Sequence, residues 1–140
     1  DKRFERMIQD LHVQPFHVNE SLTFISADAS RLEGDWFLFR FIFKVNAPLN
    51  EDYRMYFHGQ VAPENVQYLP KNFQKDKVMM WNFDPDPPTH SWPVNDYVII
   101  THRIKAALIP YKLKLGFSLP GNQYFGSSIP LGEIDFNKIK

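Results

Sequence analysis

Side chains that could bind or transform a ligand gather in residues 81–97, which read WNFDPDPPTHSWPVNDY. The prolines there cannot donate to a β ladder and favour extended backbone in the residues before them, so the segment must be a stiff, non-helical crossing between two strands. Aromatic rings stack on the apolar face of a pyranose, and carboxylates and imidazoles hydrogen-bond its hydroxyl groups. If the protein has a ligand, we expect a glycan-binding face made of Asp84, Asp86, His90, Trp92 and Tyr97.

The two tryptophans of this segment also have a structural interpretation, which we favour. Large aromatic side chains are usually buried, so Trp92 would close the open end of a β-sandwich and Trp81 would lie in its core. If Trp92 does face a glycan, a shallow loop with one stacking ring predicts weak binding, with a Kd on the order of 10 μM to 1 mM.

The same segment does not predict a metal centre. Asn82, Asp84 and Asp86 resemble a calcium loop, but they lack its glycine-containing turn and closing glutamate, so the capping of a turn explains them better. The histidines of the chain show none of the spacings typical of metal ligands; they are His12, His17, His58, His90 and His102. We expect no metal and no cofactor.

Catalytic arrangements are equally weak in the sequence. Ser91, His90 and Asp96 could form a nucleophilic triad, but adjacent side chains on an extended segment point apart and there is no G-x-S-x-G motif. The pattern places no pair of carboxylates in one cleft, as glycoside hydrolysis requires. The absence of cysteine excludes a thiol nucleophile, a thiolate-bound zinc and a disulfide. We therefore predict a non-catalytic protein, with a hydrolase as the less favoured alternative.

Composition limits the architecture and the partners. A chain of 140 residues fits one domain, residues 1–140, with a single core. The 16 basic and 16 acidic residues balance and are scattered, which argues against nucleic acid or an anionic membrane surface as the partner. No run approaches the roughly 20 apolar residues of a membrane span. The 13 phenylalanines indicate an aromatic-cored β protein.

The strongest strand pattern lies at residues 35–45, DWFLFRFIFKV. One face of that strand is apolar at period two and predicts the core; it consists of Phe37, Phe39, Phe41, Phe43 and Val45. Residues 109–118 alternate likewise, with Tyr111 and Phe117 inward and Lys112 and Lys114 facing water. For residues 54–61 either Met55 and its alternate neighbours face inward, or the reverse. Further strands are expected at residues 11–18, 21–30, 78–83, 97–104 and 129–136.

The connections follow from breakers and polarity. Residues 1–10 predict either a linker or a short helix, since Phe4, Met7, Ile8 and Leu11 have helical spacing. Pro15 places its strand at a sheet edge. Residues 62–77 predict a long surface connection, and residues 119–128 a Pro-Gly turn with a hairpin-like return. These short strands favour an all-β fold, an antiparallel immunoglobulin-like β-sandwich, with a barrel as the alternative.

Three stretches in this order resemble a known family. They are Asp52-Tyr53 leading through MYFH to His58, then the Asp-Pro segment from Asp84 through Pro88-Thr89 to Trp92 followed by Asn95-Asp96-YVII, and finally Pro110-Tyr111 with Leu113 and Gly116-Phe117. Across residues 35–136 the chain resembles the extracytoplasmic β-sandwich domain of bacterial membrane proteins that themselves resemble lipid-linked-sugar glycosyltransferases.

The resemblance implies a location and a role. It implies an accessory or recognition domain in the periplasm or at the cell surface, tethered to a membrane span outside this sequence, with any chemistry in the membrane part. The expected partner is a glycan or an envelope protein, not a nucleic acid. The alternative is a protein-interaction or scaffold module without a small-molecule ligand.

Overall fold

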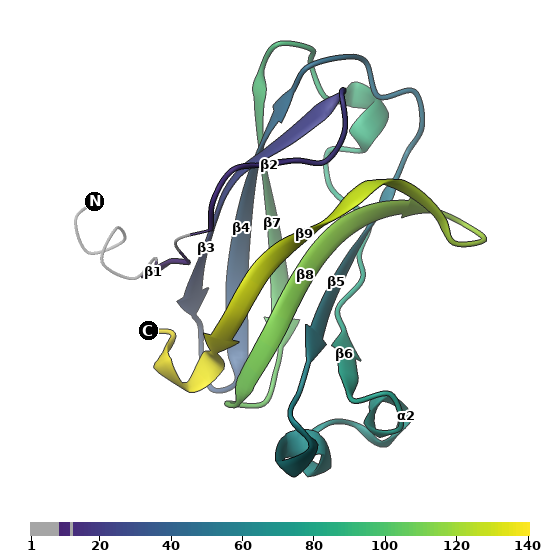
Figure 1. The fold of residues 1–140 in the computed structure, drawn as a ribbon. Coiled ribbons are helices and arrows are strands. Elements are labelled where there is room, and N and C mark those ends of the chain that lie inside the picture. The colour runs from purple at the N-terminus through teal and green to yellow at the C-terminus, as the bar shows by residue number, and fades with distance from the viewer. Residues whose placement is uncertain (1–8, 12) are drawn as a thin grey trace.

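The computed structural model describes residues 9–11 and 13–140, which form two antiparallel β-sheets packed face to face (Figure 1). Sheet A has the order β1-β3-β4-β7, with β2 also paired to β3, and sheet B has the order β6-β5-β8-β9. The strands are β1 (Gln9–Asp10), β2 (Phe16–His17), β3 (Leu22–Arg31), β4 (Trp36–Val45), β5 (Arg54–Gln60), β6 (Val78–Met80), β7 (Tyr97–Lys105), β8 (Pro110–Leu119) and β9 (Gln123–Asp135). The predicted all-β sandwich is confirmed.

Helical turns are short and lie in the connections. They are η1 (Pro63–Tyr68), α2 (Lys71–Gln74), η2 (Thr89–Ser91) and η3 (Phe136–Lys138). Residues 62–77 form the surface connection that the sequence predicts, but η1 and α2 add two helical turns that we did not expect. Pro63 and Pro70 stand at the start of these turns, where a fixed φ and a missing N–H are tolerated. Among the described residues, no helix has the length and apolar character needed to cross a membrane.

The core is built on β4, whose alternation the structure confirms. The phenylalanines at 37, 39, 41 and 43 are fully buried. Phe39 and Phe41 meet Phe57 of sheet B edge-on, with ring centroids 5.0 and 5.4 Å apart, and Phe43 meets Phe117 at 5.3 Å. Edge-to-face aromatic contacts therefore join the two sheets from Phe39 to Phe43 of β4.

The structure also settles which face of β5 lies inward. Met55 and Phe57 are fully buried, so Tyr56 and His58 belong to the opposite face. Gly59 is on the inner face, where a Cβ atom would come within 2.8 Å of Tyr111 Cδ1 and 3.0 Å of the Trp81 ring. A glycine is needed here because these two rings lie directly on the strand.

The predicted edge and hairpin are present. β1 and β2 pair with the outer edge of β3, on either side of Pro15. The helix or linker considered for residues 1–10 lies mostly outside the described residues, and its described part is the strand β1. At the other end of the chain, Gly121 and Asn122 have positive φ in the expected turn. The return and the last strand, predicted as two strands, are one strand, β9, because register shifts within the β8–β9 pair let the strand continue.

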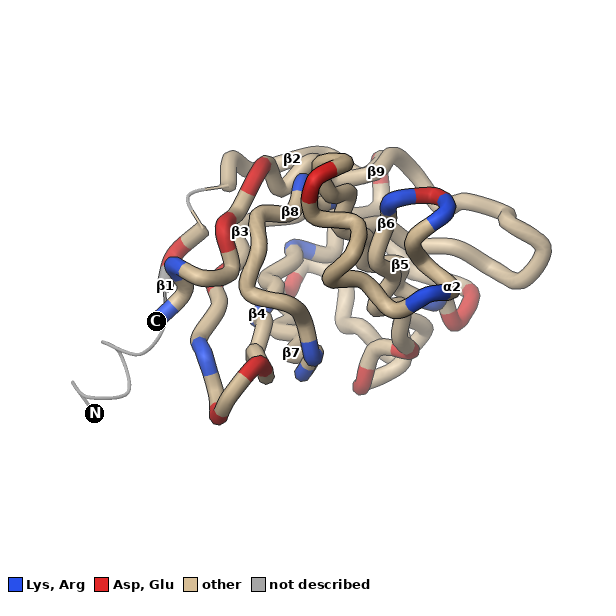
Figure 2. The backbone as a smooth tube through the Cα atoms, turned by 90° about the horizontal axis from the view of Figure 1, so that it is seen from below, with Lys and Arg blue, Asp and Glu red and all other residues tan. Residues whose placement is uncertain are grey.

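Basic and acidic residues are mixed with one another over the structure. Figure 2, a view from below, shows lysines and arginines next to aspartates and glutamates without a large field of one sign. The structure therefore shows no basic surface of the extent that nucleic-acid binding uses, within the residues it describes.

Replacing Phe41 with alanine should lower the free energy of unfolding by about 3 to 5 kcal/mol, because the deletion leaves a cavity between the sheets. Ile99→Ala on the neighbouring strand is the control; that side chain is 55% exposed, and its loss should cost less than about 1 kcal/mol. Urea unfolding measures both. Equal losses at the two positions would contradict this description of the core.

Candidate functional site

Residues 81–97, called the proline segment below, are joined to the loop before β5 by hydrogen bonds of Thr89. This residue is fully buried, and its hydroxyl donates to the Glu51 carbonyl at 2.5 Å while accepting from the Tyr53 amide at 2.8 Å. Its position in η2 follows from Pro88, which has the extended backbone of a helix N-cap. One hydroxyl therefore satisfies two backbone groups of a neighbouring loop, which is a structural role.

Trp92 closes the same end of the sandwich. Its side chain is 3% exposed, and its ring stacks on Phe43 with centroids 5.6 Å apart. The indole Nε1 donates to the Pro87 carbonyl at 2.8 Å. The structural interpretation of Trp92 is the one observed, and stacking of a sugar on this ring does not fit its burial.

Trp81 likewise lies in the core. It is 7% exposed, and its Nε1 donates to the Lys105 carbonyl at 3.1 Å. His102 is half-buried next to it, with Nε2 3.0 Å from the Trp81 carbonyl oxygen and its ring stacked on Phe83 at 3.8 Å. These contacts close the side of the sandwich between β6 and β7.

The other residues of the expected glycan face do not converge. Asp84 is exposed and lies 3.3 Å from Arg54 Nε, and Asp86 is exposed beside it in the chain. His90 pairs with Asp52, at 2.5 Å between Nδ1 and Oδ1. Tyr97 lies on the outer face of sheet A, where Lys44 Nζ is 4.7 Å from the centre of its ring.

The pKa of Asp52 is lowered by two hydrogen bonds, of which the one with the His90 side chain has the larger effect and the one with the His90 backbone the smaller.

The candidate triad of Ser91, His90 and Asp96 is not assembled. His90 is bound to Asp52, the Ser91 hydroxyl donates to the Pro88 carbonyl at 2.7 Å, and Asp96 accepts from the Tyr97 amide at 2.8 Å. In the described part of the chain, no three His, Asp or Glu side chains lie together as metal ligands would.

A different surface forms a hollow, on the outer face of sheet B. This sheet B hollow has a volume of about 700 Å³ and crosses all four strands. It is lined by Phe16, His58, Gln60, Asp76, Val78, Met80, Lys112, Leu113, Lys114, Ser128 and Pro130. A second hollow of about 260 Å³, lined in part by Tyr56 and Tyr124, continues it through the shared residues His58, Lys114 and Ser128.

His58 lies where the two hollows meet. Burial lowers the pKa of its imidazole and the positive charge of Lys114 lowers it further, while a hydrogen bond with the Asn82 side chain opposes both effects. Its Nε2 is buried and has no hydrogen-bond partner among the described residues. Buried polar atoms are normally paired, so an unpaired nitrogen in the lining of two hollows is a candidate hydrogen-bonding group for a ligand.

Tyr56 forms the floor at one end of the hollows. Its ring covers Gly116, where a Cβ atom would lie 2.0 Å from Tyr56 Cζ, and its hydroxyl is 2.9 Å from Ser128 Oγ. Tyr124 packs edge-on against it, with centroids 5.6 Å apart, and is 66% exposed. An exposed ring thus stands beside a row of hydrogen-bonding groups.

Sequence reasoning did not find this surface. Alternation in β8 predicted that Lys112 and Lys114 face water, and alternation in β5 gave one face with Tyr56, His58 and Gln60. The signal that was missing is the pairing of β5 with β8 and of β8 with β9, which brings these side chains together.

Comparisons with known proteins add no relative. No protein-family model, curated protein or solved structure matches the chain. The assignment of function therefore depends on the residues and geometry described above.

Thr89→Val should lower the free energy of unfolding by about 1 to 3 kcal/mol, because the Glu51 carbonyl and the Tyr53 amide lose their partner in a buried place. Thr101→Val makes the same chemical change at an exposed position of β7 and should change stability by less than about 0.5 kcal/mol. If the Thr89 variant is as stable as the Thr101 variant, the hydrogen bonds of Thr89 to the loop before β5 do not stabilise the fold.

Acid should destabilise the fold, because burial lowers the native pKa values of His58 and His102. Below the ordinary histidine pKa of about 6.5, the unfolded chain binds protons that the native state does not bind, so the free energy of unfolding falls as the pH drops. The lowered pKa of Asp52 acts in the same direction at more acidic pH. Urea unfolding at about pH 7.5 and about pH 5.5 tests this. Equal or greater stability at the lower pH would contradict it.

Proposed function

We propose that the chain is a non-catalytic recognition domain that binds a glycan in the sheet B hollow. The observation that carries this proposal is the hollow itself, which spans four strands and combines apolar side chains with hydrogen-bonding groups. It replaces the proline segment as the binding face, because Trp92 is buried there and the remaining candidates do not converge.

The lining supports a sugar as the ligand. Val78, Met80 and Pro130 offer apolar surface for the C–H face of a pyranose, while Gln60 and Ser128 offer hydrogen bonds for its hydroxyl groups. The exposed ring of Tyr124 stands at one end, where a further sugar unit could stack. Because the hollow crosses the strands, it suits an oligomer better than a single small molecule.

The role in the cell is proposed from the sequence resemblance. We place the domain outside the cytoplasm, in the periplasm or at the cell surface, as the accessory part of a cell-envelope membrane protein. What supports this placement is the order of the three stretches, Asp52 to His58, Asp84 to Asp96, and Pro110 to Phe117. In such an arrangement any chemistry belongs to the membrane part, and this domain supplies recognition.

We further propose that the sandwich is of the immunoglobulin-like kind. Tyr111 lies near the start of β8, where burial raises its pKa to about 12 and a hydrogen bond with the backbone of Ala107 opposes that rise. A tyrosine that bonds back to the backbone a few residues upstream marks the start of strand F in immunoglobulin-like domains. With β8 as strand F, β6-β5-β8-β9 corresponds to C′-C-F-G.

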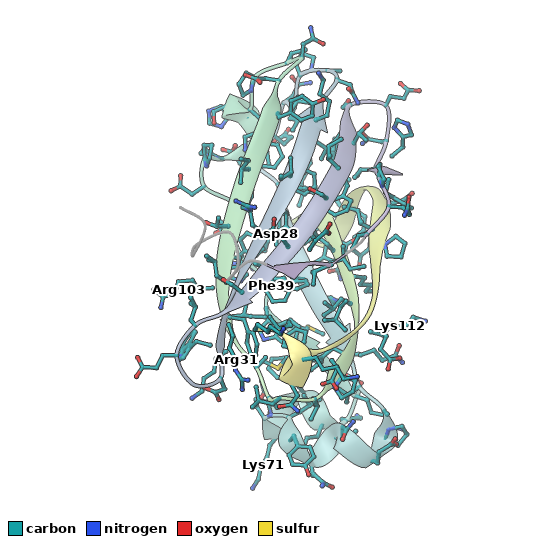
Figure 3. The ribbon with its side chains drawn as sticks, turned by 90° about the vertical axis from the view of Figure 1, so that its left-hand side faces the viewer. Asp28, Arg31, Phe39, Lys71, Arg103 and Lys112 are labelled. Atoms are coloured by element: carbon teal, nitrogen blue, oxygen red, sulfur yellow. The ribbon has the colours of Figure 1, made fainter. Side chains whose placement is uncertain are left out.

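A second candidate function, an interaction module without a small ligand, is supported by sheet A. Its outer face exposes Trp36, Tyr97 and Ile99, and Figure 3 shows β3, β4 and β7 side by side there, with Asp28 among them. β7 is an edge strand of this sheet. An extended segment of an envelope protein could add to that edge through backbone hydrogen bonds.

Titration of labelled protein with three hexamers tests the leading proposal; the hexamers are maltohexaose, the N-acetylglucosamine hexamer and hexagalacturonate. At least one should shift the amides of His58, Ser128 and Tyr124, with a Kd on the order of 10 μM to 1 mM. The Trp92 indole should not respond. Shifts confined to residues 84–97 would return the binding face to the proline segment, and the absence of any shift would leave the interaction module.

Two tyrosine variants sharpen this measurement. Tyr124→Ala removes an exposed ring from the second hollow, which continues the sheet B hollow, and should weaken binding about two- to tenfold. Tyr97→Ala removes a ring of similar exposure from sheet A, at a position of the originally expected face, and should leave the affinity unchanged.

A further inference from the structure

We infer that the sheet B hollow takes an acidic glycan, whose carboxylate or phosphate group is held by Lys112 and Lys114 together with His58. The inference rests on the proposed recognition function and names the chemical class of its ligand.

Four hydrogen-bond donors form one patch in the hollow. Lys112 and Lys114 lie two residues apart on the same face of β8, and Figure 3 shows Lys112 extending away from the molecule. The register places Gln60 opposite Lys112 and His58 opposite Lys114 on β5. Directly opposite residues of antiparallel strands have neighbouring side chains, so two cations, an imidazole and an amide face the same space.

The patch has little internal counter-charge. Neither Lys112 nor Lys114 takes part in any of the ion pairs found among the described residues. Asp76 lines the hollow, and Glu133 stands opposite Lys112 on β9, toward an adjoining hollow. Lys114 of β8 has Pro130 as its partner on β9, and this residue carries no charge. The uncompensated positive charge is therefore that of Lys114, which lies beside the imidazole of His58.

His58 gives the patch a second property. Its Nε2 has no partner in the described structure, and an anionic oxygen of the ligand would accept a hydrogen bond from it. The titratable groups that line the two hollows together with the imidazole are Lys114, Tyr56, Tyr124, Lys112 and Asp76. An anion beside Lys114 counters its charge, so binding should raise the pKa of His58 and be accompanied by proton uptake.

The surroundings of the patch argue for an anionic sugar rather than a bare anion. The apolar side chains of Val78, Met80 and Phe16 flank the cations, and a free inorganic ion would leave them uncovered. A sugar acid or a phosphorylated sugar covers them with its ring while its charged substituent meets the lysines.

Binding of hexagalacturonate and of its neutral methyl ester, which differ in the charge of the carboxyl groups, tests the inference by titration calorimetry. The acidic hexamer should bind at least tenfold more tightly, and its affinity should fall as salt is added. Lys114→Gln should weaken the acidic hexamer at least fivefold and the neutral hexamer less than twofold. Lys71→Gln, on the exposed helix α2 at the end of the molecule, is the matched control and should change neither.

Proton NMR of His58 gives an independent readout. Its pKa should rise on addition of hexagalacturonate and stay constant with the methyl ester; a parallel titration with glucose 6-phosphate distinguishes a phosphate-bearing ligand from a carboxylate-bearing one. Equal affinities for acidic and neutral hexamers at the hollow would overturn the anionic ligand and leave the recognition function standing. If no sugar, charged or neutral, shifts residues of the hollow, both proposals are wrong.

Discussion

The aromatic contacts between β4 and sheet B hold the rest of this structure in place. Phe39 and Phe41 meet Phe57 edge-on, and Phe43 lies between Phe117 and Trp92. Because each buried ring of β4 touches a ring from elsewhere in the chain, the spacing of the two sheets is set by aromatic packing and needs no covalent bridge. The outer faces of both sheets are thereby free to carry other side chains.

The closed end of the sandwich shows how a sequence that suggests chemistry can serve packing. The stretch from Asp84 to Tyr97 holds carboxylates, a histidine and aromatic rings, yet its buried residues with polar side-chain atoms, Thr89 and Trp92, direct these atoms at backbone carbonyls. Asp84 and His90 remain at the surface, where Asp84 lies beside Arg54 and His90 lies beside Asp52. The rigidity that the prolines supply is used to seal the core.

How far the sequence could predict this structure depended on the range of the interaction. The inward direction of the four phenylalanines of β4 follows from the period of two within one strand. The outward direction of Lys112 and Lys114 on β8 follows from the same period. The burial of Trp92 was favoured because large aromatic side chains are usually buried. The sheet B hollow depends on which strands are neighbours, and that pairing joins residues as distant as His58, Lys114 and Ser128. The alternation within a single strand does not indicate which strand pairs with it, so the sequence could not predict that these residues meet in one site.

The ring of Tyr56 lies across β8 in the space that Gly116 leaves, and its hydroxyl reaches Ser128 on β9. A single side chain thus ties three consecutive strands of sheet B together under the hollow. Bending of the sheet at this point would separate the Tyr56–Ser128 hydrogen bond, so this contact opposes such bending. A ligand bound as proposed would therefore meet a preformed surface, and its selectivity would arise from what this surface excludes as much as from what it binds.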